Sequence, residues 1–277
     1  MTPTRLAEVD AHEGPVYVAE EDALYFTSVP RPEVAIKRLS LRTGEVTVLR
    51  GDANKANGMA LAPDGRLVVC EQGTRSELAR ISLVNRASGA SETLVDGWQG
   101  LPLNSPNDVV VKSDGTVWFT DPSYGFLQGF RPEPKLGDVV YRHDPRTALT
   151  TVAANGFDKP NGLAFSPDEN VLYVGDSGED ARRIEAFDVV DGSRLTGRRP
   201  FAAIDSGYPD GIKVDADGLV YAASCSGVQV FDPSGELVGE IDVPGAVNLA
   251  FGRDGRLYVT ADTAVWAAAI PEPVKES

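Results

Sequence analysis

The sequence predicts an all-β fold, a six-bladed β-propeller with four-stranded blades around a central channel. Three observations predict it: a β-hairpin pattern occurs six times, the copies recur about every 40–50 residues, and no stretch keeps a helical period. Neither a long Pro-, Gly- or Ser-rich linker nor a change in composition divides the 277 residues. We therefore expect a single propeller domain over residues 1–277.

The clearest copy of the hairpin spans residues 107–121. A short apolar strand follows Asn107, an Asp114-Gly115 turn comes next, and a second strand ends at Asp121. Because the two strands of a hairpin are antiparallel, Asn107 and Asp121 are expected at the same end of the unit.

The other five copies share this phase, with an acidic turn about seven residues after an anchor position. The anchors are separated by 44, 50, 54, 49 and 37 residues, which suits one propeller blade per copy. In chain order the anchors are Glu13, Asn57, Asn107, Asn161, Asp210 and Val247.

Each unit has room for two further strands. The sixth unit is short of residues, so strand 263–269 is expected to pair with the N-terminal segment 5–9 and so close the ring. The segment 124–135, rich in Gly and Pro, is expected to be a long loop of the kind that often covers a site. The remaining outer strands are predicted at residues 35–41, 46–49, 78–83, 92–95, 138–143, 149–153, 183–188, 198–204, 228–231 and 237–243.

Composition narrows the partners and the compartment. The formal net charge of -15 and the pI of about 4.6 disfavour nucleic-acid binding, because such a surface repels phosphate. Cys70 and Cys225 have no metal-like or disulfide-like spacing. Since no apolar run of about 18 residues and no signal-peptide pattern is present, we expect no membrane partner and a cytoplasmic protein, or a periplasmic one if a leader has been removed. The oligomeric state is left open.

The anchors predict a ring of oxygen ligands at one mouth of the channel. Glu13, Asn107, Asn161 and Asp210 offer two carboxylates and two carboxamides. These hard donors suit Ca²⁺ best, with Mg²⁺ and Mn²⁺ as alternatives, and Zn²⁺ as a further one although its usual His and Cys ligands are scarce. Asn-Gly and Asp-Gly are also common turn dipeptides. However, each hairpin already has its own turn, and the apolar Val247 shows that the anchor need not be polar to make the fold.

Four other positions near this mouth are assigned lesser roles. Asn57 has the anchor phase and is predicted to line the pocket. Asp121 and Asp176 end the second strands of their hairpins, where they would support the ligands or cap the strand ends. His12 precedes Glu13 and, because adjacent strand residues face opposite sides, is predicted to pack rather than to bind.

Four segments then carry a family resemblance over nearly the whole chain. They are Glu13-Gly14-Pro15, Ser105-Pro106-Asn107-Asp108, Lys159-Pro160-Asn161-Gly162-Leu163 and Tyr208-Pro209-Asp210-Gly211. In order and spacing they resemble the gluconolactonase, senescence-marker-protein (regucalcin) and luciferin-regenerating-enzyme-like family. The resemblance implies a six-bladed propeller with one catalytic divalent cation, usually Ca²⁺, in the central channel.

The resemblance also implies roles for individual residues. Glu13, Asn161 and Asp210 match the family's metal ligands, and Asn107 matches a residue that binds metal in some members and substrate in others. Asp210 matches the carboxylate proposed as general base, or as nucleophile in related diisopropyl-fluorophosphatases. The animal proteins carry a sugar-binding arginine where this chain has Ser105. The segment Asp121-Pro122-Ser123-Tyr124-Gly125 is more similar to bacterial gluconolactonases, so Tyr124 is expected to line the pocket instead.

These observations favour a metal-dependent hydrolase that opens a small-molecule sugar lactone, with Asp210 taking a proton from the attacking water. One alternative is a phosphotriesterase or diisopropyl-fluorophosphatase-like hydrolase on the same metal site. Another is a propeller that binds partners without catalysis.

Overall fold

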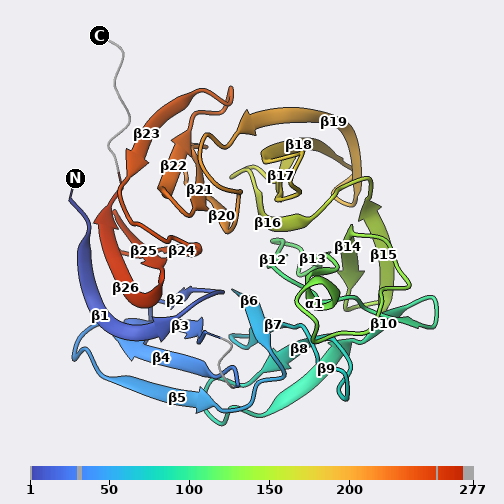
Figure 1. The fold of residues 1–277 in the computed structure, drawn as a ribbon, viewed down its shortest axis with the longest axis horizontal. Helices are drawn as coiled ribbons and strands as arrows, with labels where there is room; N and C mark the ends of the chain where they lie inside the picture. The colour runs from blue at the N-terminus through green and yellow to red at the C-terminus, as the bar shows by residue number, and fades with distance from the viewer. Residues whose placement is uncertain (1, 30–32, 254, 271–277) are drawn as a thin grey trace.

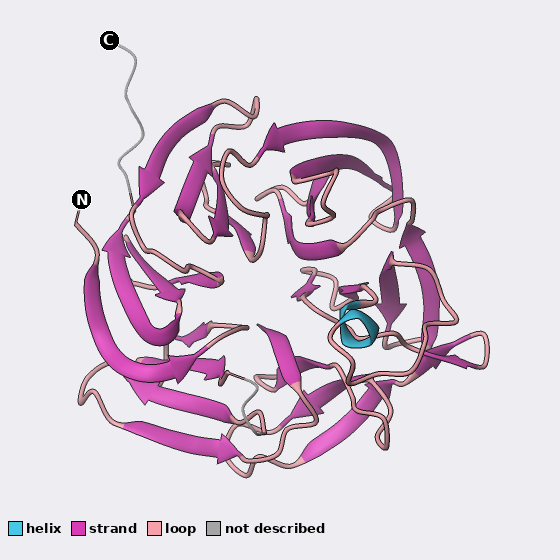
Figure 2. Ribbon diagram, in the orientation of Figure 1, coloured by secondary structure: helices cyan, strands magenta, loops and turns pink. Residues whose placement is uncertain are grey.

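The computed structural model describes residues 2–29, 33–253 and 255–270. These residues form six four-stranded antiparallel sheets arranged as blades around a common centre (Figure 1). Figure 2 shows that the ring consists almost wholly of strands and connecting loops. The predicted six-bladed propeller is therefore confirmed.

Five blades follow the chain order from an inner to an outer strand. The first two are β2 (Val16–Val18), β3 (Ala23–Thr27), β4 (Ile36–Ser40) and β5 (Val46–Arg50), then β6 (Ala56–Leu61), β7 (Leu67–Glu71), β8 (Arg80–Val84) and β9 (Ser91–Val95). The third and fourth are β12 (Val109–Val111), β13 (Val117–Asp121), β14 (Val139–Asp144) and β15 (Leu149–Ala154), then β16 (Pro160–Phe165), β17 (Val171–Asp176), β18 (Arg183–Val190) and β19 (Arg194–Ala203). The fifth is β20 (Ile212–Val214), β21 (Val220–Ser224), β22 (Gly227–Phe231) and β23 (Leu237–Ile241).

The sixth blade joins the two ends of the chain. It is formed by β24 (Asn248–Phe251), β25 (Arg256–Thr260), β26 (Asp262–Ala269) and, as its outer strand, β1 (Thr4–Ala11). Glu8 lies opposite Ala264 in the antiparallel β1–β26 pair. The predicted closure of the ring by the N-terminal segment is thus confirmed, and every predicted outer strand lies within four residues of its observed ends.

The apolar side chains lie mainly between the blades. Among the described residues they form six clusters, and each cluster joins two consecutive blades around the ring. The second strand of a blade is therefore covered on both faces: all five residues of β13 are buried, for example, including Trp118 and Phe119. Burial of this kind is the main favourable term in folding and explains the apolar runs in the sequence.

The turns of the inner hairpins contain residues with left-handed backbone geometry. Gly115 has a φ of 84°, which suits a residue without a Cβ atom. Blade four has Glu169 at this place with a φ of 56°. Its carboxylate accepts hydrogen bonds of 2.6 Å from the backbone and hydroxyl of Ser113 and pairs with Lys112 at 2.9 Å, so the less favourable backbone geometry is offset by contacts with the neighbouring blade.

Two short elements were not predicted. The expected loop 124–135 begins with a helix, α1 (Tyr124–Leu127), and a small ladder joins β10 (Gly97–Trp98) to β11 (Leu101–Pro102). Four residues are too few to give a helical period in the sequence, which is why the loop assignment was wrong for α1. No helix in the described part of the chain is long and apolar enough to cross a membrane.

Candidate active site

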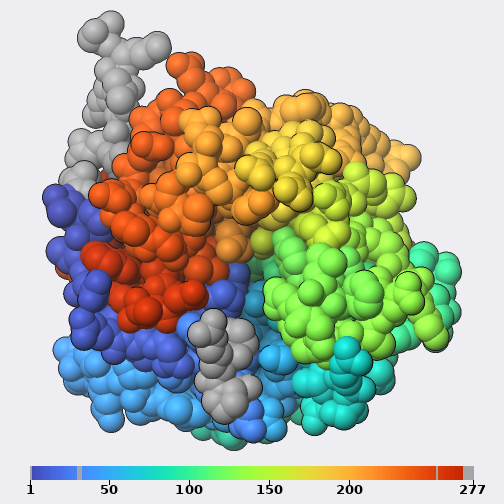
Figure 3. All heavy atoms as spheres, viewed as in Figure 1, coloured from blue at the N-terminus to red at the C-terminus, as the bar shows by residue number. Residues whose placement is uncertain are grey.

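A polar cavity of about 220 Å³ lies at the centre of the ring. It opens on the face that carries α1, and Figure 3 shows this face hollowed near its centre. The lining is mostly polar and comes from several blades: His12, Glu13, Ser28, Val34, Ala56, Asn57, Gln72, Asn107, Tyr124, Gln128, Asn161 and Asp210.

All five polar anchors reach this cavity. Each stands at or just before the start of an inner strand, and the inner strands converge on the channel (Figure 1). The apolar anchor Val247 is buried just before β24. The structure thus brings together the predicted ligands Glu13, Asn107, Asn161 and Asp210 with the predicted lining residue Asn57.

Backbone contacts between blades fix the anchors relative to one another. The backbone N–H of Gly162 donates a hydrogen bond of 3.1 Å to the carbonyl oxygen of Asp210. In the same way, the backbone N–H of Gly58 donates one of 2.8 Å to the carbonyl oxygen of Asn107. A Cβ atom on Gly162 would lie 2.1 Å from the same Asp210 oxygen. The glycine after the anchor is therefore required by close packing of neighbouring inner strands, independently of any turn.

The two carboxylates of the cavity are held in an unfavourable electrostatic environment. Burial raises the pKa of Glu13 well above its ordinary value, and the nearby Asp210 raises it further. Burial likewise raises the pKa of Asp210 to about 7, although hydrogen bonds with Glu13 and Asn161 favour the ionised form. A cation bound between Glu13 and Asp210 would favour the ionised form of both carboxylates and so lower both pKa values.

The carboxamides provide an independent sign of an oxygen-binding site. The side-chain oxygens of Asn57, Asn107 and Asn161 are buried and have no hydrogen-bond partner among the described residues. Buried acceptors are usually satisfied, so three unpartnered oxygens in one cavity suggest a ligand. Within the described ranges, no group of three or more His, Cys, Asp or Glu side chains is placed to hold a metal ion. A cation here would therefore rely on carboxamide as well as carboxylate oxygens, which suits a hard ion.

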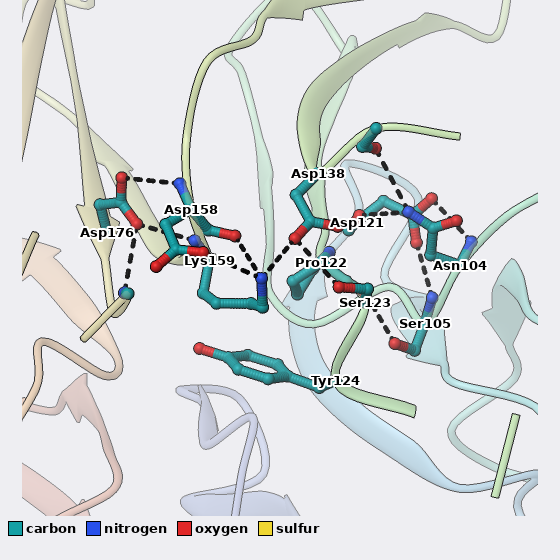
Figure 4. A network of polar contacts seen from close by, with 12 residues as sticks. Asn104, Ser105, Asp121, Pro122, Ser123, Tyr124, Asp138, Asp158, Lys159 and Asp176 are labelled. Atoms are coloured by element: carbon teal, nitrogen blue, oxygen red, sulfur yellow. Dashed lines mark hydrogen bonds and ion pairs between the residues drawn. The ribbon is translucent and has the colours of Figure 1, made fainter. Parts of the chain in front are cut away.

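Asp121 supports the loop that leads to Asn107. Its two carboxylate oxygens accept the backbone N–H groups of Asn104 and Ser105 at 2.9 and 2.8 Å (Figure 4). Burial nevertheless raises the pKa of Asp121 to about 7. Its side chain does not line the cavity.

Asp176 repeats this arrangement one blade later. Its carboxylate accepts the backbone N–H groups of Asp158 and Lys159 at 3.1 and 2.8 Å, three and two residues before the anchor Asn161 (Figure 4). Asp176 also lies outside the cavity lining. Each of the two carboxylates thus holds the loop that leads to an anchor residue.

The helix α1 holds Tyr124 at the cavity. The Tyr124 hydroxyl lies 3.5 Å from the side-chain nitrogen of Asn161. Ser105 does not line the cavity; its hydroxyl donates to Pro122 and accepts the N–H of Gly125, so it anchors α1. The buried Arg131 fixes the far end of the segment by donating to the carbonyls of Thr74, Glu77, Leu103 and Asn104.

His12 lines the cavity together with Glu13, so the argument that the two residues face opposite sides was wrong, whereas its role in packing stays a prediction. Its ring nitrogen Nδ1 lies 2.7 Å from the carboxylate of Asp262, and the ring borders the cavity beside Glu13. Burial alone would lower the pKa of His12, but the contact with Asp262 and the nearby Glu13 raise it above its ordinary value. The alternation argument failed because β1 ends at Ala11 and β2 begins at Val16, so His12 does not lie in a strand.

Gln72 and Gln128 also line the cavity and were not predicted. Neither belongs to the repeated hairpin phase: Gln72 directly follows β7, and Gln128 follows α1. Position relative to the end of the second strand could have identified Gln72, whereas Gln128 depends on how α1 folds over the ring.

Comparison with known proteins gives a consistent result. Residues 11–263 match the family described as the SMP-30/gluconolactonase/LRE-like region. A gluconolactonase from Zymomonas mobilis is 30% identical over 92% of this chain and 77% of its own length. The solved structure of a gluconolactonase from Xanthomonas campestris is 36% identical, with a TM-score of 0.88 over 96% of this chain and 89% of that one. A calcium-binding protein, regucalcin from Agrobacterium tumefaciens, is 20% identical with a TM-score of 0.79 over 98% and 94%, a likeness that shows the fold alone.

Proposed function

The chain belongs to the SMP-30/gluconolactonase/LRE-like family and is a lactonase-type hydrolase, and we propose that it opens a sugar lactone in the central cavity with one bound divalent cation. The observation that carries this proposal is the convergence of two carboxylates, the buried Glu13 and the partly buried Asp210, and three unpartnered carboxamide oxygens on one cavity.

The proposed cation ligands are Glu13, Asn107, Asn161 and Asp210. All four donate through oxygen, which favours Ca²⁺, with Mg²⁺, Mn²⁺ and Zn²⁺ as alternatives to be compared. A cation bound there would polarise the lactone carbonyl and stabilise negative charge on its oxygen.

Asp210 is the proposed general base. Its carboxylate takes a proton from water as the water oxygen bonds to the carbonyl carbon of the lactone. The ring C–O ester bond then breaks, and the proton passes to the departing ring oxygen, which gives a hydroxy acid. Asp210 lines the cavity, so its carboxylate is placed to accept a proton from a water molecule that enters it.

The rest of the cavity suits a hydroxylated ring. Asn57, Gln72, Gln128 and Tyr124 offer amide and hydroxyl groups that can hydrogen-bond to sugar hydroxyls. A wider basin of about 610 Å³ adjoins the cavity and shares Tyr124, Asn161 and Asp210 with it. The ammonium group of Lys159 in this basin is already bonded to the carboxylates of Asp138 and Asp158 (Figure 4).

The proposal is tested by following acid release from glucono-1,5-lactone. Metal-stripped protein should be inactive and should regain activity on addition of CaCl₂, with MgCl₂, MnCl₂ and ZnCl₂ compared in parallel. Full activity in metal-free protein would reject the cation-dependent mechanism. A phosphotriester is included in the same panel of substrates. A phosphotriesterase-like enzyme, the alternative hydrolase, would hydrolyse the phosphotriester and would not hydrolyse the lactone.

Changing Asp210 to Asn should lower kcat by about 100-fold or more, because the carboxamide cannot accept the proton. The far-ultraviolet circular dichroism spectrum should stay that of the wild type. Asp205→Asn is the matched control, since Asp205 is an exposed carboxylate before β20 and should keep wild-type kcat. An unchanged kcat in Asp210→Asn would remove this residue from the role of base.

A further inference from the structure

In four of the six blades the anchor is followed by a glycine, and in the other two blades it is followed by a polar residue. Four blades carry Gly14, Gly58, Gly162 and Gly211 there, whereas blade three has Asp108 and blade six has Asn248. A Cβ atom on Gly58 would lie 2.4 Å from Oδ1 of Asp108, and one on Gly211 would lie 2.2 Å from Cγ of Asn248. These two glycines therefore leave room for two polar side chains beside the channel axis.

Asn248 connects to one of the predicted cation ligands. Its side-chain nitrogen Nδ2 donates a hydrogen bond of 2.7 Å to Oε2 of Glu13, and both residues are buried. The backbone N–H of Gly14 donates to the same Glu13 oxygen at 3.1 Å. The Oδ1 atom of Asn248 accepts the backbone N–H of Leu249 at 2.7 Å, which fixes the orientation of the carboxamide.

Asp108 and Lys213 complete a polar layer with Asn248. The Lys213 ammonium lies 3.8 Å from Oδ2 of Asp108 and 3.5 Å from Oδ1 of Asn248, and it donates to the Ile212 carbonyl at 3.0 Å. Asp108 is almost wholly buried, and its Oδ1 accepts the N–H of Val109.

This layer lies between two different environments. Glu13, above it, lines the polar cavity. Lys213, below it, borders an apolar pocket of about 250 Å³ formed by inner-strand residues such as Val16, Met59 and Phe251. Neither Asp108 nor Asn248 lines either space, so both are enclosed within the channel.

From these contacts we propose that Asn248 is a positioning residue for Glu13. By holding Oε2, it orients the carboxylate so that Oε1 is presented to the cation, while Lys213 and Asp108 hold the layer beneath in place. This inference rests on the proposed function, since it assumes that Glu13 binds a cation. Partners that orient a metal ligand from behind typically contribute a factor of 10–100 to metal affinity.

The test measures calcium binding to metal-stripped protein by isothermal titration calorimetry. Asn248→Ala should raise the Kd for Ca²⁺ by about 10–100-fold. Asn248→Leu keeps the branching of the side chain at Cγ and removes the donor, so it should raise the Kd by a similar factor even if the alanine variant folds poorly. Gln229→Ala is the matched control. Gln229 is also a buried carboxamide, and it donates a hydrogen bond of 3.2 Å to the Glu240 carboxylate, but it does not line the cavity.

Each other outcome overturns the inference in a recognisable way. A wild-type Kd in both Asn248 variants means that Asn248 does not position Glu13, and leaves the proposed function standing. An equal loss of affinity in Gln229→Ala means that a general loss of packing is responsible. A wild-type protein that binds none of Ca²⁺, Mg²⁺, Mn²⁺ and Zn²⁺ overturns the proposed function together with the inference.

Discussion

Three carboxylates lie near the channel axis, and one ammonium group, that of Lys213, lies 3.8 Å from one of them, Asp108. Glu13 and Asp108 are almost wholly buried, and Asp210 faces the cavity. Removing charges from water is costly, so each must find a partner. Burial raises the pKa of Asp108, and the Lys213 ammonium works against that rise. Lys213 thus favours the ionised form of Asp108, against the effect of burial.

Replacing Lys213 with Met should lower the free energy of unfolding by about 2 kcal/mol, because it leaves Asp108 buried without its cation. The estimate lies below the usual range for a broken buried pair because Lys213 is a quarter exposed. The double variant Asp108→Asn/Lys213→Met should recover most of the loss, since no unpaired charge remains. Urea unfolding of the wild type, the two single variants and the double variant measures this coupling. Additive losses would mean that the two residues do not act as a pair.

The sequence identified the individual anchor residues, but it did not identify the polar layer of Asp108, Asn248 and Lys213. The anchors were found because a repeated phase marks them, and the structure places all five polar ones in one cavity. Asn248 was missed because blade six was represented by its apolar anchor, Val247, one position earlier. The metal and catalytic roles of Glu13, Asn107, Asn161 and Asp210 stay predictions, as do the pocket and supporting roles of Asn57, Tyr124, Asp121 and Asp176.

The elements were predictable where a period fixes them. Inner and second strands follow from apolar runs bounded by Asp-Gly turns, and blade packing covers both of their faces. The helix α1 could not be predicted, because contacts with distant loops determine it. The Arg131 guanidinium joins it to carbonyls on two loops, and neither Thr74 nor Leu103 is near Arg131 in sequence.

The strand β1 should be essential for the stability of the ring. Deleting residues 2–10 would leave the edge of β26 unpaired and expose part of the cluster to which Ala7 and Val9 contribute. We expect the melting temperature to fall by about 10 °C or more. Glu8→Ala, which removes an exposed charge pair and keeps the strand, should leave the melting temperature nearly unchanged. A deletion variant that melts like the wild type would show that three strands suffice for blade six.

For the whole molecule, the net negative charge and the burial of carboxyl groups both lower the stability of the folded state as the pH rises. The pKa values of Asp121 and Asp210 are both about 7 in the folded protein, against an ordinary value of 3.8. The folded state therefore holds protons that the unfolded chain releases between about pH 4 and pH 7. The contribution of these groups to stability is greatest below pH 4 and is lost as the pH rises through 7. The net charge of -15 adds repulsion between carboxylates, which also lowers the stability of the folded state as the pH rises.

Metal-free protein should accordingly be less stable at pH 8 than at pH 5, by on the order of 2–4 kcal/mol. Excess CaCl₂ should narrow this difference, because it binds the ionised carboxylates and adds about 2.7 kcal/mol at 100 times its Kd. Urea unfolding in chelator and in calcium at both pH values measures the effect. Asp121→Asn should reduce the pH dependence in chelator and keep the calcium effect, since Asp121 lies outside the cavity. Stability that rises from pH 5 to pH 8 in chelator would contradict this account.

The closure of the ring also sets the order in which the molecule can be completed during synthesis. Glu13 and Asn248, which share a hydrogen bond, are 235 positions apart in the chain. A growing chain on the ribosome holds β1 without its partner until residues 262–269 have emerged. Blades one to five can fold as they appear, but Glu13 obtains its hydrogen bond from Asn248 of blade six last. Premature termination before β26 should therefore give a product in which β1 lacks its partner strand, and such a product would be a substrate for quality-control proteases.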